Sequence, residues 1–291
     1  MRFAVNPLQF YAGADGTLSF GDGPAYRDVL AACAAAGFEA VQAEPALAGG
    51  ADAVGPTLAA AGLAAAPPYF SGPLHEPERL DGIAERFRAV IDLCAELELD
   101  RVVIAADMTR ERFLSAGRHA GEEPDPAVAA ALCAAAERLG RIAGDRGVLA
   151  CFHPHAGTPV ESPAEIAALL DGTTEAVALC PDTGHLAWGG VADVRGFLRA
   201  HRARVGMLHL KDMDRAVAAH GRAEGWSYRR HVREGLWREP GRGDLDCAGV
   251  LGDLAGEGLW CVVEVDHPAA GDARASVAES GRFVDGWRKE R

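Results

Sequence analysis

Short runs of apolar residues alternate with longer amphipathic stretches along most of the chain. The short runs predict β-strands, and the stretches with an apolar residue every three or four positions predict helices. Strands are expected at 3–5, 40–44, 63–69, 101–105, 148–152, 176–180, 205–210 and 260–265. Helices are expected at 24–36, 51–61, 78–97, 124–145, 163–170, 191–202, 247–257 and 275–289.

Some of the helix ends are marked by their own residues. The segment Ser162-Pro163-Ala164-Glu165 has the spacing of a capping box, with proline at the first helical position. The segment beginning EEPDPAV places acids and proline before an alanine-rich run that ends at glycine. These local signals support the helices expected at 163–170 and 124–145.

The regular alternation of strand and helix indicates parallel βαβ units. Eight such units in 291 residues predict an α/β fold of the (β/α)8 barrel type, formed by one domain over 1–291. A doubly wound sheet is the alternative, but the glycine-rich turn of its dinucleotide-binding form is missing after the first strand, in FAVNPLQF. The connection at 212–245 is long for a barrel loop, and we expect it to form a lid.

Composition and charge exclude several classes of protein. The formal net charge is −13 and no run of lysine and arginine occurs, so we expect no nucleic-acid partner. The first residues have one positive charge and no long apolar run, which predicts no signal peptide. Without eighteen uninterrupted apolar residues, the sequence also predicts no membrane span.

The seven cysteines are odd in number and form no C-x-x-C pair. This pattern argues against a disulfide framework and against a zinc knuckle. Most of the cysteines lie in apolar runs, which predicts reduced, buried side chains and a cytoplasmic location. They are Cys33, Cys94, Cys133, Cys151, Cys180, Cys247 and Cys261.

Polar side chains gather just after the predicted strands, on the side where barrel enzymes build their active sites. Each residue alone has an ordinary explanation, because acids after strands often cap helices and single histidines are often structural. The pattern across successive strands favours a site. Its members are Glu44, Asp107, His153, His155, Asp182, His185, His209, Lys211, Glu264 and Asp266.

Four of these residues predict a metal site. His153, Asp182, His209 and Glu264 follow four consecutive strands, whose ends converge in a barrel. Two imidazoles and two carboxylates suit a divalent transition metal, and the absence of a thiolate favours Mn²⁺ or Co²⁺, with Fe²⁺, Zn²⁺ or Mg²⁺ as alternatives. A histidine–carboxylate hydrogen-bond network without metal is the other interpretation.

Several motifs of the second half of the chain, over about 147–268, resemble the xylose isomerase-like TIM barrels, a superfamily of sugar phosphate isomerases and epimerases. The resemblance is strongest to the inosose dehydratases, which act on 2-keto-myo-inositol. The motifs that carry it are HPHAGT, PDTGHLAWGG, HLKD, EPGRGDLD and VVEVDHP. Before residue 100 the resemblance is one of architecture.

The resemblance implies a role for several residues. In the wider superfamily, strand ends supply Glu, Asp, His and Glu to one metal, and His153 stands where the first glutamate is found. The dehydratases share this histidine, which favours dehydration over a symmetric two-glutamate epimerase. Arg215 and His185 match substrate contacts of the superfamily, and Glu44 and Asp107 are further candidates for substrate binding. Asn6 and Gln9 replace a W-x-N motif, which leaves the substrate open to relatives of inosose.

The expected chemistry is removal of a proton next to the carbonyl of a small polyhydroxylated keto-sugar or keto-cyclitol, followed by loss of water. Candidate bases are His155 and Glu264, and candidate acids are Lys211 and His185. A ketose isomerase or epimerase using the same metal is the main alternative. A repair endonuclease is disfavoured by the negative charge, and an inactive binding subunit is the remaining alternative.

The expected lid at 212–245 contains three large aromatic residues. Trp226, Tyr228 and Trp237 lie in this connection. They are expected either to close over the site or to pack against a second copy of the chain in a homo-oligomer.

Overall fold

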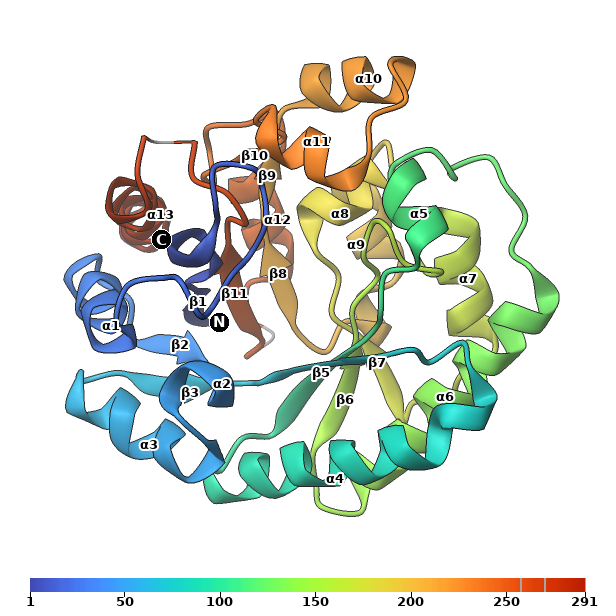
Figure 1. Ribbon diagram of the computed structural model, residues 1–291, viewed down its shortest axis with the longest axis horizontal. Helices are drawn as coiled ribbons and strands as arrows, with labels where there is room; N and C mark the ends of the chain where they lie inside the picture. Colours follow the sequence, from blue (N-terminus) through green and yellow to red (C-terminus); the bar gives the residue numbers. More distant parts are fainter. Residues whose placement is uncertain (257, 270, 291) are drawn as a thin grey trace. The chain divides into compact units, whose positions relative to one another are not determined.

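The computed structural model describes residues 1–256, 258–269 and 271–290. Parallel strands alternate with helices along the chain (Figure 1). Two compact units can be distinguished. The first unit comprises Met1–Ala66, His209–Glu224 and Arg229–Arg291, and the second comprises Pro67–Leu208 and Gly225–Tyr228.

The second unit contains a four-stranded parallel sheet. Its strands follow chain order: β4 (Tyr69–Gly72), β5 (Arg101–Ala106), β6 (Leu149–Phe152) and β7 (Val177–Leu179). In this register Val103 lies beside Cys151, and Cys151 lies beside Ala178. The helices α4 (Leu80–Glu96) and α6 (Pro126–Gly144) pack against these strands, and such cover explains why β5 and β6 are almost continuously apolar.

A five-stranded sheet holds the strands of the first unit. Its order is β3 (Ala64–Ala66), β2 (Ala40–Gln42), β1 (Arg2–Asn6), β11 (Trp260–Glu264) and β8 (Leu208–Leu210). The first and last strands of the chain therefore pair in parallel, with Asn6 beside Glu264 at their C-terminal ends. This pairing brings the start of the chain to a predicted site residue.

The remaining elements are mostly helices. They are α1 (Tyr26–Ala35), α2 (Pro45–Ala48), α3 (Ala51–Ala60), α5 (Arg110–Ser115), α7 (Pro163–Asp171), α8 (Thr183–Trp188), α9 (Val194–Ala200), α10 (Arg215–Ala223), α11 (Tyr228–Arg233), α12 (Cys247–Leu254) and α13 (Ala273–Lys289). Two short antiparallel strands, β9 (Asp212–Met213) and β10 (Trp237–Arg238), pair within the 212–245 connection.

Each predicted strand and helix overlaps an observed one, but the third predicted strand is divided. Residues 63–69 contain β3, which pairs with β2, and the start of β4, which pairs with β5. Pro67 and Pro68 separate the two, because neither proline has an N–H to donate to a sheet. The strand expected at 205–210 is also shorter, with only Leu208–Leu210 in β8.

The capping predictions are confirmed. Ser162 and Glu165 form a reciprocal capping box at the start of α7. Asp125 caps α6 by accepting hydrogen bonds from the N–H groups of Ala127 and Val128. The short helices α2, α5, α8, α10 and α11 have no counterpart among the predicted elements. All except α10 span six residues or fewer, which is too short for a helical periodicity to be visible, and α10 lies in the connection that the sequence predicts as a lid.

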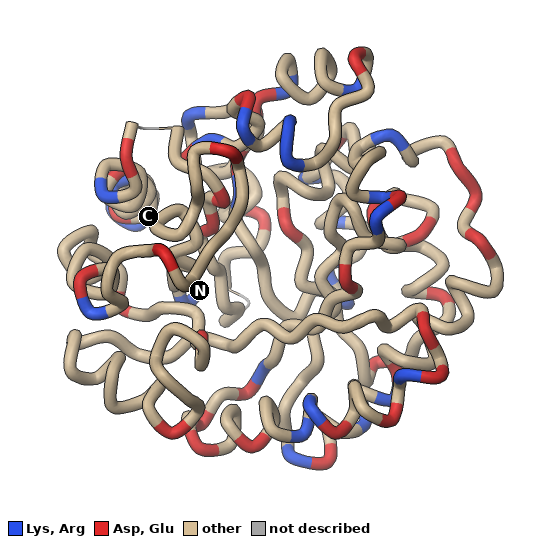
Figure 2. The backbone as a smooth tube through the Cα atoms, viewed as in Figure 1, with Lys and Arg blue, Asp and Glu red and all other residues tan. Residues whose placement is uncertain are grey.

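The state of the cysteines agrees with the prediction from the sequence. All seven cysteines are free, and all except Cys133 are buried. Acidic and basic residues are interspersed along α4 and α13, as Figure 2 shows. Among the described residues, every helix is too short or too polar to cross a membrane.

Gly140 tests how tightly α6 packs. A Cβ added to Gly140 would lie 2.5 Å from the carbonyl oxygen of Ala176. Alanine normally stabilises a helix relative to glycine, but here we expect Gly140→Ala to lower the free energy of unfolding by about 1–3 kcal/mol. Urea denaturation measures this. The control is Gly144→Ala at the exposed end of the same helix, where a Cβ meets nothing within 4 Å and stability should hold or rise.

Candidate functional site

His153 follows β6 directly and is held by the backbone of the neighbouring strand end. Its Nδ1 donates to the carbonyl oxygen of Cys180 at 3.0 Å, since a carbonyl can only accept. The side chain is buried and its ring meets the Tyr69 ring edge-on. Fixing Nδ1 in this way leaves Nε2 as the nitrogen that carries the lone pair, which is the usual arrangement of a metal-binding histidine.

His155 carries its ring proton on the same nitrogen, Nδ1, but its side chain is only partly buried. Its Nδ1 donates to the carbonyl oxygen of Ala156 at 2.7 Å, so that Nε2 is again the basic nitrogen. Its backbone N–H bonds the carbonyl oxygen of Val160 and closes the loop that follows β6. The ring centre lies 3.7 Å from that of His185.

In His185 the roles of the two ring nitrogens are reversed, because Nδ1 accepts a hydrogen bond. It lies in the first turn of α8, whose cap Asp182 accepts its backbone N–H at 2.8 Å. The N–H of Ala156 points at His185 Nδ1 at 3.4 Å, and an amide can only donate. In the neutral ring the proton therefore lies on Nε2. Ligand atoms of His153, His155 and His185 all lie within 4.8 Å of one another, so the second unit gathers two basic imidazole nitrogens and one N–H donor.

Aromatic side chains form a wall beside these histidines. Tyr228 stacks on His155 with ring centres 5.7 Å apart and planes at 20°, and it also contacts Trp188 at 5.1 Å. The ring of Phe113 in turn stacks on that of Tyr228, with ring centres 6.0 Å apart. Tyr228 belongs to the 212–245 connection, and the role of this connection as a lid stays a prediction. The parts played by Trp188 and Phe113 were not predicted, because apolar aromatics give no signal separating site from core.

The loop between His153 and α7 is held by hydrogen bonds from its backbone to two acidic side chains. The carboxylate of Glu161 is buried and accepts the N–H groups of Gly117 and Gly157, each at 2.7 Å. Glu165 accepts the N–H of Glu161 and pairs with Arg112 at 2.5 Å. Sequence reasoning identified Glu165 only as a helix cap and missed Glu161.

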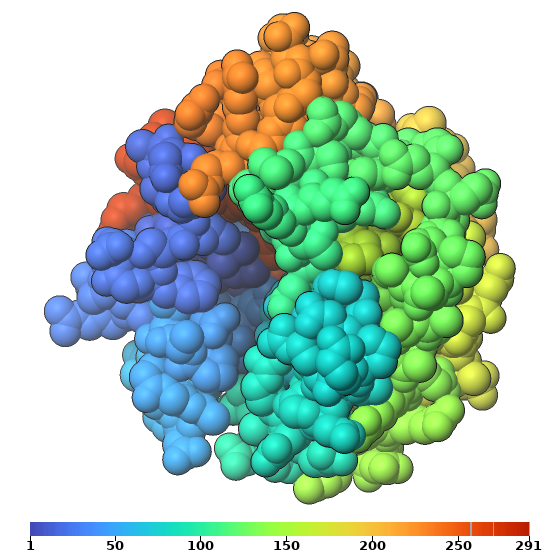
Figure 3. Space-filling view, turned by 45° about the vertical axis from the view of Figure 1, so that its right-hand side comes forward, coloured from blue at the N-terminus to red at the C-terminus, as the bar shows by residue number. Residues whose placement is uncertain are grey.

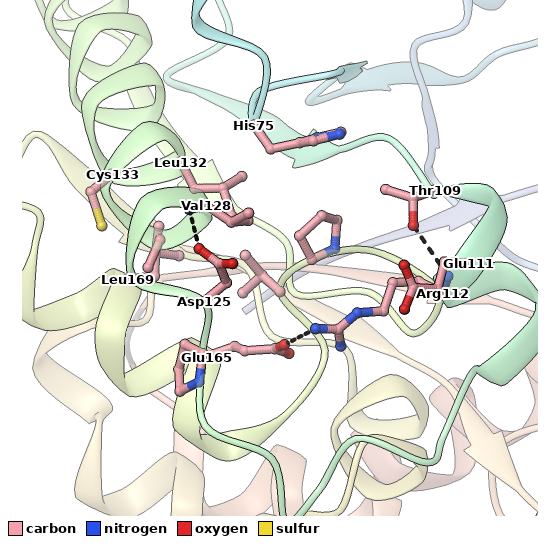
Figure 4. Close-up of a pocket in the computed structure, with 14 residues that line it drawn as sticks. His75, Thr109, Glu111, Arg112, Asp125, Val128, Leu132, Cys133, Glu165 and Leu169 are labelled. Carbon is pink, nitrogen blue, oxygen red and sulfur yellow. Dashed lines mark hydrogen bonds and ion pairs between the residues drawn. The ribbon is translucent and has the colours of Figure 1, made fainter.

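A pocket of about 390 Å³ lies beside this bracing. It is lined by Arg112, Glu165, Pro159 and Val160 together with residues at the start of α6 (Figure 4). Figure 3 shows the α5 segment, in green, at the surface of the molecule, where Leu114 is half exposed. His153, His155 and His185 do not line the pocket, which separates it from the histidine group.

In the first unit, charged side chains meet at the ends of β1, β8 and β11. Lys211 is completely buried and its Nζ lies 2.6 Å from Glu264 Oε1 and 2.8 Å from Asp266 Oδ1. Asn6 donates to the other oxygen of Glu264 at 2.7 Å, and His209 Nδ1 lies 3.4 Å from that same oxygen. The structure therefore brings together four predicted residues, His209, Lys211, Glu264 and Asp266.

The 212–245 connection is fixed at its base by Asp212. The buried carboxylate accepts the backbone N–H groups of Met213, Gly241, Gly243 and Leu245 at 2.8–3.0 Å. Burial raises the pKa of Asp212, and these hydrogen bonds act against that rise. A Cβ at Gly243 would lie 2.3 Å from the carboxylate, which explains the second glycine of EPGRGDLD.

The three predicted substrate-binding residues lie at a helix cap, at an exposed helix start and after a strand. Glu44 caps α2 by accepting the N–H of Ala46, and burial raises its pKa. Arg215 is exposed at the start of α10. Asp107 is half-buried after β5, with its N–H bonded to Gly72. Capping is the ordinary explanation noted for Glu44, and the substrate roles of all three stay predictions.

Comparison with known families decides the fold. Residues 30–285 match the model of the xylose isomerase-like TIM barrel family. The chain belongs to this family. The predicted α/β barrel fold is therefore confirmed, whereas the prediction of a single domain stays a prediction.

Similar proteins include dehydratases. An inosose dehydratase of Bacillus velezensis is 33% identical over 158 residues, which are 53% of this chain and 53% of that protein. The chain thus spans about half the length of this relative. A probable 3-DHS dehydratase, AsbF of Bacillus anthracis, has a TM-score of 0.74 at 10% identity, covering 98% of this chain and 99% of that one. The IOLI protein, crystallised with a zinc atom, has a TM-score of 0.68 at 13% identity, covering 100% and 99%.

The buried charges of the first unit predict a strong effect of Lys211→Met. Removing the ammonium leaves Glu264 and Asp266 buried without their cation, so the free energy of unfolding should fall by roughly 3–5 kcal/mol. Urea denaturation of metal-stripped protein measures this loss. The control is Lys289→Met, whose exposed pair with Asp285 should cost under about 1 kcal/mol. Equal losses in both variants would contradict the prediction.

Proposed function

We propose that this protein is a divalent-metal-dependent enzyme that removes water from a small keto-cyclitol or keto-sugar. The observation that carries the proposal is the opposite hydrogen-bond polarity of the adjacent imidazoles of His155 and His185. Proton removal next to a carbonyl and protonation of a departing hydroxyl need one base and one acid side by side. The similarity to inosose dehydratase supports a keto-cyclitol as the substrate class.

The proposed metal ligands are His153, Asp182, His209 and Glu264. The donor chemistry of the described residues fits a divalent cation, because His153 has its Nδ1 fixed on a carbonyl and His209 lies beside Glu264 at 3.4 Å. In a barrel, the C-terminal ends of the strands that precede these four residues surround one cavity. The zinc atom of the IOLI protein supports a metal in this family, and Mn²⁺ or Co²⁺ remains our expectation. A bound cation supplies a Lewis acid for the ketone oxygen.

In this proposal His155 is the base and His185 is the acid. His155 Nε2 accepts the proton from the carbon next to the carbonyl, while its Nδ1–H stays on the carbonyl oxygen of Ala156. His185 Nε2–H donates to the β-hydroxyl, which leaves as water, and the product is an enone. Tyr228 and Trp188 stack beside the two rings and reduce access of water.

Glu264 and Lys211 are assigned supporting roles instead. Both oxygens of Glu264 already accept hydrogen bonds, from Lys211 and Asn6, which suits a fixed ligand better than a mobile base. Lys211 is held between two carboxylates, which suits a residue that orients Glu264 and offsets its charge.

One prediction of the proposed function concerns metal content. Purified protein should contain about one divalent ion per chain, as expected for one Lewis-acid site. His153→Ala should lose the ion because it removes a ligand, whereas His155→Ala should keep it. Elemental analysis of the two variants, prepared side by side, measures the difference. Equal metal content in both would exclude His153 as a ligand.

Another prediction of the proposed function concerns turnover of 2-keto-myo-inositol. His155→Gln and His185→Gln should each lower kcat by roughly 10²–10⁴-fold, the usual contribution of a general acid or base, and metal content should not change. Loss of water is followed by the absorbance of the enone. Exchange of the proton next to the carbonyl with solvent deuterium, without loss of water, would point to the isomerase or epimerase alternative.

A further inference from the structure

We propose that Glu161 is a positioning residue for His155, acting as a clasp between two loops beside the histidine group. The proposal rests on the proposed function for its catalytic part. The clasp itself consists of Glu161 and the backbone N–H groups of Gly117 and Gly157. It requires no ligand and can be tested without knowing the substrate.

The geometry of the clasp is symmetrical. Oε1 of Glu161 accepts the N–H of Gly117 and Oε2 accepts the N–H of Gly157, both at 2.7 Å. The side chain is almost completely buried, with 1% of its residue surface exposed. One carboxylate therefore joins the segment after α5 to the loop after β6, two charge-assisted hydrogen bonds being stronger than neutral ones.

Both partners need to be glycine. The φ angles of Gly117 and Gly157 are +76° and +89°, a left-handed conformation that side chains disfavour. A Cβ at Gly117 would also lie 2.1 Å from the indole nitrogen of Trp188, the residue that stacks on His185 at 6.4 Å. The clasp thus sets the backbone beside both halves of the proposed acid–base pair.

His155 is held through the second partner. Gly157 follows it by two residues, its carbonyl oxygen accepts the N–H of Thr109 at 3.2 Å, and the N–H of His155 bonds Val160 at 3.0 Å. The loop therefore has few degrees of freedom while the Glu161 carboxylate stays in place. Without the carboxylate, the loop that carries the His155 ring, whose centre lies 3.7 Å from that of His185, loses one of its anchors.

A carboxylate suits this task better than a neutral side chain. Only a carboxylate offers two acceptor oxygens and no N–H, so glutamine would turn an N–H₂ group toward one of the two glycines. Burial of the charge raises the pKa of Glu161, and the N–H of Gly157 acts against that rise. A buried ion that serves only stability is often replaceable by apolar residues, so its presence here agrees with a positioning role.

The test compares Glu161→Gln and Glu161→Asp with Glu137→Gln. Glu137 also accepts a backbone N–H, that of Thr174 at 3.0 Å, but it ties α6 to the segment before β7. In both Glu161 variants, amide hydrogen exchange at Gly117 or Gly157 should accelerate at least about 10-fold, and kcat should fall roughly 10- to 100-fold, because small displacements of a catalytic group have effects of that size. Glu137→Gln should change neither quantity.

Glu161→Asp separates position from charge. It keeps the negative charge but cannot reach both glycines, so it should resemble Glu161→Gln. Recovery of wild-type kcat in Glu161→Asp, or unchanged exchange at both glycines in Glu161→Gln, would overturn the proposal.

The wild-type protein gives a test that does not depend on a variant that folds. Because one side chain holds both amides, Gly117 and Gly157 should show protection factors that agree within about 10-fold, set by a common opening. Clearly different protection would overturn the clasp. If the clasp is confirmed by exchange but no keto substrate is converted, the proposed function fails and the clasp stands.

Discussion

The architecture depends on one constraint: in a parallel sheet covered by helices, a buried polar side chain needs a polar partner, and most such partners lie where the strands end. Val103, Ala150, Cys151 and Val262 are buried along the strands, and ionisable groups appear within a residue or two of the last apolar position. There each charge meets a backbone group or an opposite charge. His153 meets a carbonyl oxygen, Glu161 two amides and Lys211 two carboxylates.

The same constraint explains how much the sequence reveals. Strand positions and the polar residues after them could be predicted, because a change from apolar to polar is visible residue by residue. His209, Lys211 and Glu264 are indeed neighbours, and His153, His155 and His185 form one group. The division of the third strand was also encoded, in Pro67 and Pro68, but a continuous apolar pattern concealed it.

What could not be predicted depends on contacts between distant loops. Glu161 follows HPHAGT by only a few residues, yet its role depends on Gly117, which is 44 positions away. The direction of the hydrogen bond at His185 depends on the backbone N–H of Ala156, and no periodicity encodes it. Asp212 presents a similar case, because a single acid after HLK gives no hint that it collects four amides from 213–245.

The four hydrogen bonds of Asp212 close the ends of the long connection onto each other, independently of its middle. Chain length between two joined ends has only a weak effect on closure entropy, of about 0.6 kcal/mol for each doubling. Changes of length are therefore best accommodated at the exposed turn 222–225, whereas Trp237 is buried, pairs with Met213 and lies over the Lys211 ammonium at 4.7 Å. Since Tyr228, which stacks on His155, follows this turn directly, sequence drift at the turn can alter the aromatic wall of the site, while the part of the connection that contacts Lys211 stays under tighter constraint.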